Sequence, residues 1–199
     1  MKTAYINNTP YAIEAGETIL QFLERNTGNR PPTLCDAPNL DAFGSCRVCS
    51  VDVALEEDGK AKAMASCHSP INDGFYIYPD SEPIQKLRKN IIELVLTDHP
   101  LTCLTCEVNG NCELQDVAAQ VGARDVRYPE GENHLHRQKD FSHPYMTSDM
   151  SKCINCYRCV RACDEVQGEM VLSVDGRGFD AKIIKSDNDT FFDSDCESG

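Results

Sequence analysis

Three groups of residues in this chain combine cysteine and histidine at spacings that suit metal binding. Thiolate sulfur and neutral imidazole nitrogen are ligands both for iron–sulfur clusters and for zinc. The first group, the Cys35 set, comprises Cys35, Cys46, Cys49 and Cys67. The second group, the His99 set, comprises His99, Cys103, Cys106 and Cys112. The third group, the Cys153 set, comprises Cys153, Cys156, Cys159 and Cys163.

The Cys153 set lies in the run CINCYRCVRAC, whose C-x2-C-x2-C-x3-C spacing is typical of bacterial ferredoxins. We expect its first three cysteines to bind one [4Fe–4S] cluster, while Cys163, one helical turn further on, serves a second cluster. Cys196 would open the partner motif, whose next cysteine would fall at the position of Gly199. The sequence therefore predicts one ferredoxin cluster and, from Cys163 and Cys196, part of another. A zinc knuckle or a redox-active C-x2-C pair is the alternative.

The Cys35 set has one close pair, within FGSCRVCSVDV, and two distant members. Plant-type [2Fe–2S] proteins use C-x4-C-x2-C followed by a distant cysteine, whereas ten residues separate Cys35 from Cys46 here. Gly44 and Ser45 permit a tight turn that directs backbone N–H groups at sulfur. The pattern favours a [2Fe–2S] cluster, with four-thiolate zinc or disulfides as alternatives.

The His99 set lies in DHPLTCLTCEVNGNCELQD. Because three cysteines lie so close to His99, we interpret this set as the ligands of a [4Fe–4S] cluster with one imidazole ligand. A Cys3His zinc site is the alternative. A neutral imidazole in place of a thiolate removes one negative charge, so this cluster should have a higher reduction potential. We interpret the other histidines as ordinary polar residues: His68, His134, His136 and His143.

The elements that would position these ligands indicate an α+β chain. Short alternating runs predict strands, and apolar residues at helical spacing predict helices. Residues 1–80 are expected to form a mixed sheet with one helix; its strands are at 3–6, 11–13, 49–55, 61–67 and 74–79 and its helix at 14–27. Asn7-Asn8 should form the first hairpin turn, and Gly28 should end the helix.

The remaining sequence divides into two further expected domains. Residues 81–147 should form helices at 82–98, with Ser81 as N-cap, and at 112–122, followed by an irregular stretch. One apolar face of the first of these helices is expected in the core: Ile84, Leu87, Ile91, Leu94 and Val95. Residues 148–199 should form the cysteine loop, a short helix and a hairpin around Asp175–Gly178.

The composition of the chain argues against several classes of function. The formal net charge of −13 and the lack of a basic stripe argue against nucleic-acid binding. No apolar run approaches the ~18 residues of a membrane helix, and the N-terminus lacks a signal-peptide core. A cytoplasmic protein with reduced thiols is therefore expected. No nucleophile, acid–base pair, GxGxxG or GxxxxGK[ST] motif is present, so we expect neither a substrate active site nor a nucleotide site on this chain.

The order of the three sets resembles an electron-transfer region found in several oxidoreductases. These are the complex I large peripheral subunit, the small diaphorase subunit of NAD-reducing hydrogenases, [FeFe]-hydrogenases and NAD-dependent formate dehydrogenases. The sequence is most similar to the formate dehydrogenase alpha subunit, in the segments HPLTCLTCEVNGNCELQD, CVRACDEVQG and VDGRGFDAKI.

This resemblance implies a fold, cofactors and partners. It implies a β-grasp [2Fe–2S] ferredoxin-like domain, a small helical His/Cys cluster domain and a partial bacterial-ferredoxin-like domain. It also implies a relay between a formate-oxidising molybdenum or tungsten centre and a flavin/NAD-binding subunit. The molybdopterin domain of that family would follow the second ferredoxin motif. The equivalent relay of a hydrogenase or of complex I is the alternative, and a zinc-stabilised interaction module is a more distant one.

Overall fold

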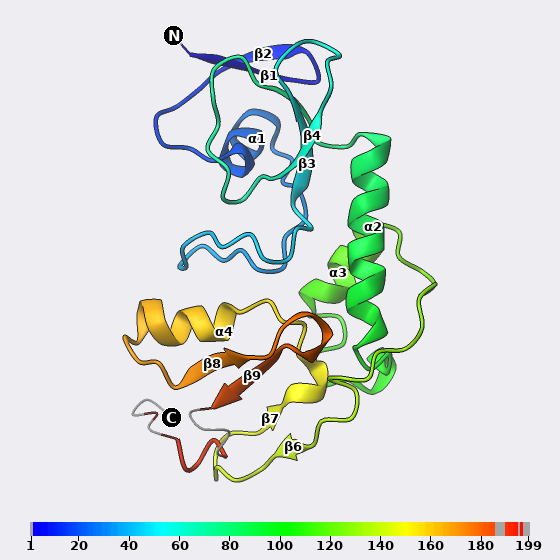
Figure 1. Ribbon diagram of the computed structural model, residues 1–199, viewed down its shortest axis with the longest axis vertical. Coiled ribbons are helices and arrows are strands. Elements are labelled where there is room, and N and C mark those ends of the chain that lie inside the picture. The colour runs from blue at the N-terminus through cyan, green and yellow to red at the C-terminus, as the bar shows by residue number, and fades with distance from the viewer. Residues whose placement is uncertain (1, 186–189, 195, 197–199) are drawn as a thin grey trace. The chain divides into compact units, whose positions relative to one another are not determined.

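The computed structural model describes residues 2–185, 190–194 and 196, which form two compact units (Figure 1). The N-terminal unit comprises Met1–Asp36, Ala42–Ile92 and Glu113–Arg124. The C-terminal unit comprises Ala37–Asp41, Glu93–Cys112 and Asp125–Gly199. Neither unit is a continuous stretch of sequence, and each combines helices with strands. The predicted mixture of α and β structure is confirmed.

A five-stranded mixed sheet forms the N-terminal unit, in the order β2-β1-β5-β3-β4. Its strands are β1 (Thr3–Ile6), β2 (Thr9–Ala12), β3 (Ser50–Ala54), β4 (Lys62–Ala65) and β5 (Tyr76–Tyr78). β1 and β5 are parallel, and the other pairs are antiparallel. Asn7 and Asn8 have φ values of 47° and 67°, which suit a two-residue hairpin turn. The predicted hairpin is confirmed, although β2 begins at Thr9 rather than at Tyr11.

The helix α1 (Ile19–Thr27) packs on one face of this sheet (Figure 1). Thr18 and Gln21 form a capping box, so the helix begins later than the sequence pattern indicated. Gly28 ends it at φ 66°, as predicted. The buried core joins α1 to the strands through Ala4, Ile6, Ile19, Phe22, Leu23, Val51, Val53, Ile71 and Ile77.

The long helix α2 (Glu82–Thr97) has nearly the predicted bounds, but its buried face differs from the prediction. Leu94 is 41% exposed, whereas Ile92 is fully buried. Arg88 is only 5% exposed, on the same face as Ile84 and Ile92. Its guanidinium donates to the backbone oxygen of Ser50 from Nε at 3.1 Å and from Nη2 at 2.8 Å. The prediction of Leu94 in the core was therefore wrong, and the buried face runs instead through Ile84, Arg88 and Ile92. The N-terminal unit also contains α3 (Glu113–Gln120).

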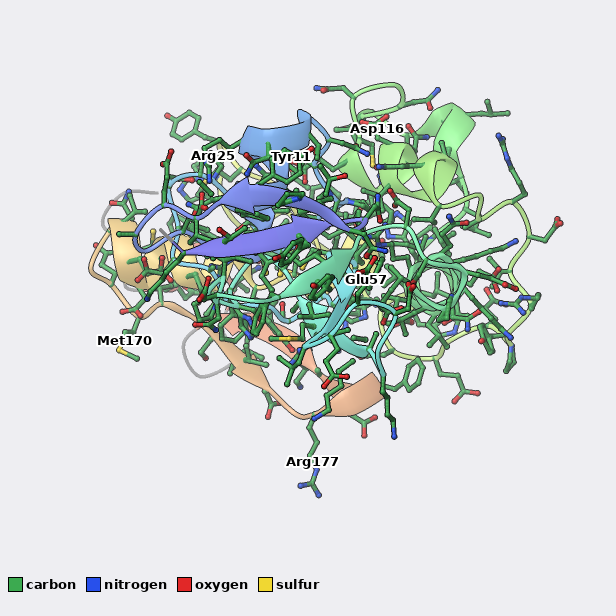
Figure 2. The ribbon with its side chains drawn as sticks, turned by 90° about the horizontal axis from the view of Figure 1, so that it is seen from above. Tyr11, Arg25, Glu57, Asp116, Met170 and Arg177 are labelled. Atoms are coloured by element: carbon green, nitrogen blue, oxygen red, sulfur yellow. The ribbon has the colours of Figure 1, made fainter. Side chains whose placement is uncertain are left out.

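Short elements dominate the C-terminal unit. They are η1 (Cys103–Thr105), β6 (Lys139–Asp140), β7 (Ser148–Asp149), η2 (Met150–Lys152), α4 (Arg158–Arg161), η3 (Ala162–Val166), β8 (Leu172–Asp175), η4 (Gly178–Asp180) and β9 (Lys182–Lys185). β8 and β9 pair antiparallel and confirm the predicted hairpin. Figure 2 shows Arg177 projecting outward beyond these strands. Across the described residues, every helix is too short or too polar to cross a bilayer.

Candidate iron–sulfur sites

The Cys35 set gathers beside the ends of two paired strands. Cys49 immediately precedes β3, and Cys67 follows β4 by two residues. Ser66 joins the two strand ends, because its Oγ donates to the backbone oxygen of Cys49 at 2.7 Å. Leu20 of α1 packs against both cysteines in a small buried cluster. The strand pairing and α1 thus hold two of the four proposed ligands, Cys49 and Cys67, next to each other.

Direct contacts connect all four thiols of this set. Hydrogen bonds from Cys46 and then from Cys67 lower the pKa of Cys35, and the same contacts raise the pKa of Cys46 and Cys67. A further bond from Cys67 lowers the pKa of Cys49 to about 6, although burial of that thiol opposes the shift. Cys35 and Cys49 are fully buried, and Cys67 is 3% exposed. These mostly buried thiols are linked in the order Cys46, Cys35, Cys67 and Cys49, and they form a donor set that fits a four-thiolate [2Fe–2S] cluster.

The backbone around Cys46 is shaped by left-handed residues. Gly44 has φ +70°, and a Cβ atom at this position would lie 2.7 Å from Cδ2 of His68. Arg47 has φ 59°, and its backbone oxygen accepts from the Ser50 N–H at 3.1 Å. The tight turn expected from FGSC is therefore present. Glycine is favoured at position 44 by its left-handed conformation, and a larger residue would also have to displace the exposed His68 ring.

The loop between Cys35 and Cys46 has a structural role of its own. Its segment Ala37–Asp41 belongs to the C-terminal unit. The Asp41 N–H donates to Oε2 of Glu165 at 2.8 Å, and the Asp41 carbonyl accepts from Nη1 of Arg161. The extra residues that distinguish this spacing from the plant-type pattern thus bind the helical segment that carries Cys163.

A site for a single metal ion needs several ligand side chains that converge on one position. Within the part of the chain that the structure describes, no three His, Cys, Asp or Glu side chains converge where one metal ion could be held. A cluster distributes its protein ligands over two or more irons, so it does not require such convergence. All twelve cysteines lie among the described residues, and none of them forms a disulfide there.

The His99 set follows the end of α2. The turn η1 bonds the Cys106 N–H to the Cys103 carbonyl at 3.1 Å, and the Asn109 N–H donates to the Cys106 carbonyl at 3.1 Å. Burial and then the charge of Lys152 lower the pKa of His99. This lowered pKa favours the neutral ring, which is the form that binds metal. Its Nδ1 atom is buried without a hydrogen-bond partner among the described residues.

Next to this set lies a buried pair that the sequence did not indicate. His134 is 3% exposed, and its Nδ1 lies 2.5 Å from Oδ2 of Asp98, the residue before His99. Burial raises the pKa of Asp98, but hydrogen bonds from the ring and the N–H of His134 outweigh it and lower that pKa. The interpretation of His134 as an ordinary polar residue was therefore wrong. Because 36 residues separate the partners, no local pattern could have revealed the pair.

The Cys153 set occupies a loop and the start of a helical segment. Asn155 and Tyr157 have φ values of 50° and 60°, which reverse the chain between cysteines. The Asn155 N–H donates to Sγ of Cys153 at 3.4 Å. Desolvation raises the pKa of Cys159 to about 11 even though much of this residue is exposed, and charges on Cys156 and Cys153 add to the shift. The first three thiols are thus close enough to interact electrostatically.

Cys163 and Cys196 are the two cysteines predicted to serve a second cluster. Cys163 is on η3, where its carbonyl accepts from the Glu169 N–H at 2.9 Å. Cys196 is half-buried in the C-terminal tail. Gly199, at which the second motif would continue, lies outside the described residues. No contact between Cys163 and Cys196 is described, so their shared role stays a prediction.

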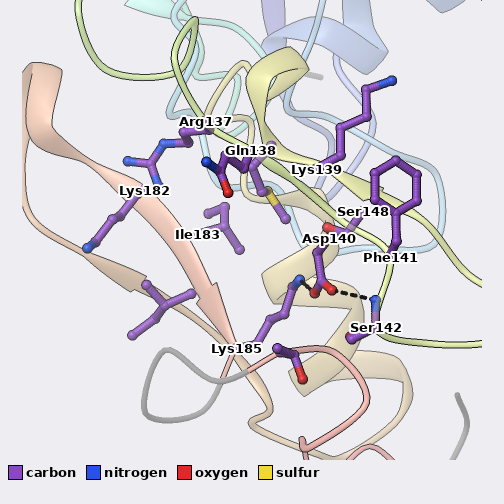
Figure 3. A pocket seen from close by; sticks show the side chains of 13 residues that line it. Arg137, Gln138, Lys139, Asp140, Phe141, Ser142, Ser148, Lys182, Ile183 and Lys185 are labelled. Atoms are coloured by element: carbon purple, nitrogen blue, oxygen red, sulfur yellow. Dashed lines mark hydrogen bonds and ion pairs between the residues drawn. The ribbon is translucent and has the colours of Figure 1, made fainter.

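A separate pocket of about 670 Å³ lies in the C-terminal unit (Figure 3). Its basic residues are Arg137, Lys139, Lys182 and Lys185. Lys139 pairs with Asp149 at 3.2 Å, Lys182 pairs with Asp175 at 3.0 Å, and Lys185 pairs with Asp140. The three lysines therefore serve the fold, and the pocket is not an evident anion site.

Comparisons with known sequence families match three parts of the chain. The family described as "2Fe-2S iron-sulfur cluster binding domain" matches residues 2–82. "NADH-ubiquinone oxidoreductase-G iron-sulfur binding region" matches residues 88–127. "NADH-quinone oxidoreductase subunit 3, ferredoxin-like domain" matches residues 143–197. The cofactors of the chain are therefore [2Fe–2S] and [4Fe–4S] clusters, as predicted.

Individual relatives agree with these matches. The chain is 34% identical over 178 residues to the mitochondrial NADH-ubiquinone oxidoreductase 78 kDa subunit of Candida albicans, covering 89% of this chain and 24% of the relative. It is 36% identical over 202 residues to the NADP-reducing hydrogenase subunit HndD of Solidesulfovibrio fructosivorans, covering 98% and 33%. The chain thus spans a third or less of the length of these curated relatives.

A solved structure supports the same relationship. A chain in the crystal structure of an NAD+-reducing [NiFe]-hydrogenase in the H2-reduced state matches with a TM-score of 0.80 and 28% identity. The match covers 96% of this chain and 79% of that one. The chain belongs to the family of iron–sulfur regions shared by NADH-quinone oxidoreductases, including the 78 kDa component of complex I, and by NAD-reducing hydrogenases.

Proposed function

We propose that this chain is an iron–sulfur electron relay within an oxidoreductase complex. The observation that carries the proposal is the network of four contacting thiols in the Cys35 set, followed in the sequence by two further ligand groups. Iron–sulfur clusters supply one-electron chemistry over roughly −700 to +450 mV. The protein contributes the ligands, their burial and the hydrogen bonds to sulfur that tune each potential. The chain itself carries no substrate active site in this proposal.

We further propose which residues hold each cluster. The Cys35 set would bind [2Fe–2S] in a β-grasp domain within residues 1–80. The His99 set would bind [4Fe–4S] within residues 81–147. The first three members of the Cys153 set would bind a ferredoxin-type [4Fe–4S] cluster within residues 148–199. Cys163 and Cys196 would contribute to a second one.

The proposed partners are a flavin/NAD-binding subunit and a catalytic molybdopterin domain or subunit, in the cytoplasm. The specific proposal is a relay for formate oxidation, which rests on the phrases that resemble formate dehydrogenase. A relay for hydrogen oxidation is the second candidate. It is favoured by the likeness to the NAD+-reducing [NiFe]-hydrogenase chain and to HndD. The complex I relatives support a third version of the same relay.

Anaerobic purification tests the cluster content. Iron and acid-labile sulfide should be present in amounts that match one [2Fe–2S] and at least one [4Fe–4S] cluster, with the corresponding EPR signals after reduction. Stoichiometric zinc without iron would instead support a zinc-stabilised interaction module.

The substrate of the assembly is tested in the native complex. If the formate relay is correct, formate should reduce the clusters at least as fast as the complex turns over. Reduction by hydrogen but not by formate would favour the hydrogenase relay. Reduction by NADH alone would favour the complex I version, and any of the three results would keep the electron-relay proposal.

A further inference from the structure

A lysine lies against one proposed ligand of the His99 set. Nζ of Lys152 donates to Sγ of Cys106 at 3.6 Å, across 46 residues of sequence. The Lys152 side chain is 32% exposed, so it is partly withdrawn from water. Hydrogen bonds to cluster sulfur and nearby charge are two of the means by which proteins adjust reduction potentials. We propose that Lys152 raises the reduction potential of the cluster bound by the His99 set, through its charged hydrogen bond to Cys106.

Local structure directs this side chain. Lys152 ends η2, and the Cys153 N–H donates to the Met150 carbonyl at 3.2 Å, which closes the turn. Asp149 caps the same turn by accepting from the Ser151 N–H at 3.2 Å. Lys152 is therefore anchored immediately before the first ligand of the Cys153 set, while its ammonium faces a ligand of the His99 set.

The carboxylate nearest to Lys152 is shared with a second lysine. Oδ2 of Asp149 lies 3.8 Å from Nζ of Lys152 but is closer, at 3.2 Å, to Nζ of Lys139. Reduction adds negative charge to the cluster, so a fixed positive charge stabilises the reduced form more than the oxidised form. Lys152 acts through Cys106 and is therefore a positioning residue.

The proposal rests on Cys106 being a cluster ligand, and its test compares the full chain with three variants in redox titrations followed by EPR. Lys152→Met removes the charge and the bond. It should lower the ratio of reduced to oxidised cluster at a fixed potential about tenfold, which corresponds to a shift of about 59 mV for one electron. Lys152→Arg keeps the charge and should stay within threefold of the wild type. Lys139→Met is the matched control, because Lys139 carries an equal charge and pairs with the same oxygen of Asp149 but has no described bond to sulfur.

Three outcomes would overturn the proposal. They are an unchanged potential in Lys152→Met, an equal shift in Lys139→Met, and loss of the cluster in both Lys152 variants, which would make the lysine purely structural. If only Lys152→Met fails to assemble, Lys152→Gln measures the loss of charge instead. Cys106→Ser distinguishes failure of the proposed ligand Cys106 from failure of the proposed role of Lys152. An unaltered cluster signal in that variant would refute the proposed ligand, whereas an altered signal with an unchanged Lys152→Met potential refutes only the role of the lysine.

Discussion

Arg88 should be one of the most costly polar residues to replace in the N-terminal unit. Its side chain is almost fully buried and supplies two hydrogen bonds to the backbone oxygen of Ser50, the residue after Cys49. A third bond joins Nη1 to Asp80 at 3.0 Å. Burial lowers the pKa of Arg88, which records the cost of withdrawing the charge from water. Arg88→Met would remove that cost together with the donors.

The net effect of Arg88→Met can be estimated from these opposing contributions. A hydrogen bond from a charged donor contributes about 1.5–3 kcal/mol, and a buried group that loses its partners costs about 1–3 kcal/mol. Methionine fills much of the vacated volume and recovers part of the loss. We expect a net destabilisation of about 2–3 kcal/mol, which lowers the melting temperature by roughly 4–12 °C for a chain of this size.

The assay is thermal bleaching of the [2Fe–2S] absorption in the full chain, with urea unfolding as a second measure. Arg124→Met is the matched control, because Arg124 is an exposed arginine of the same unit and its replacement should change stability by no more than about 0.5 kcal/mol. Equal melting temperatures for the two variants would refute the reasoning. So would an Arg88→Met protein that is as stable as the wild type.

Three further perturbations have defined outcomes. Gly44→Ala should lower [2Fe–2S] occupancy, measured as iron per chain, because alanine is strained at φ +70° and its Cβ would have to displace the His68 ring; full occupancy would contradict this. His99→Cys should keep a [4Fe–4S] EPR signal at a lower potential, since a thiolate adds one negative charge, whereas an unchanged signal and potential in His99→Ala would make the histidine a bystander. Lys185 holds the pKa of Asp140 below its ordinary value of 3.8, so the pair should stabilise the C-terminal unit fully above about pH 4 and lose this effect as the pH falls through the lowered pKa. Asp140→Asn should flatten that acid dependence in urea unfolding, and an unaltered profile would count against it.

The sequence was most informative where ligands are local. The spacing of the cysteines predicted the cluster types, because ligands a few residues apart must share one loop. Gly28 and the pair Asn7-Asn8 predicted turns correctly, since their left-handed conformations restrict the residue types that fit. Helix α1 began later than expected because the Thr18 capping box, and not hydrophobic periodicity, determines its first residue.

Contacts between distant residues could not be predicted. The bond from Lys152 to Cys106 joins positions 46 residues apart, and the pair of His134 with Asp98 spans 36 residues. Such pairs depend on how loops pack, and a periodic pattern in one segment carries no information about them. The burial of Arg88 on α2 could not be predicted either, because a charged side chain is normally expected on the exposed face of a helix.

Each of the two units is built from several separate stretches of sequence, and this affects how such a region could be exchanged between proteins by recombination. Ala37–Asp41 lies within the loop of the first ligand set yet belongs to the C-terminal unit, and Glu113–Arg124 returns to the N-terminal unit after the His99 set. A single cut near residue 80 would leave behind both Arg88 and α3. Exchange of one cluster site between proteins would therefore need several coordinated breakpoints. We expect the three ligand sets to be gained and lost as one block, so that recombination exchanges whole relays instead of individual clusters.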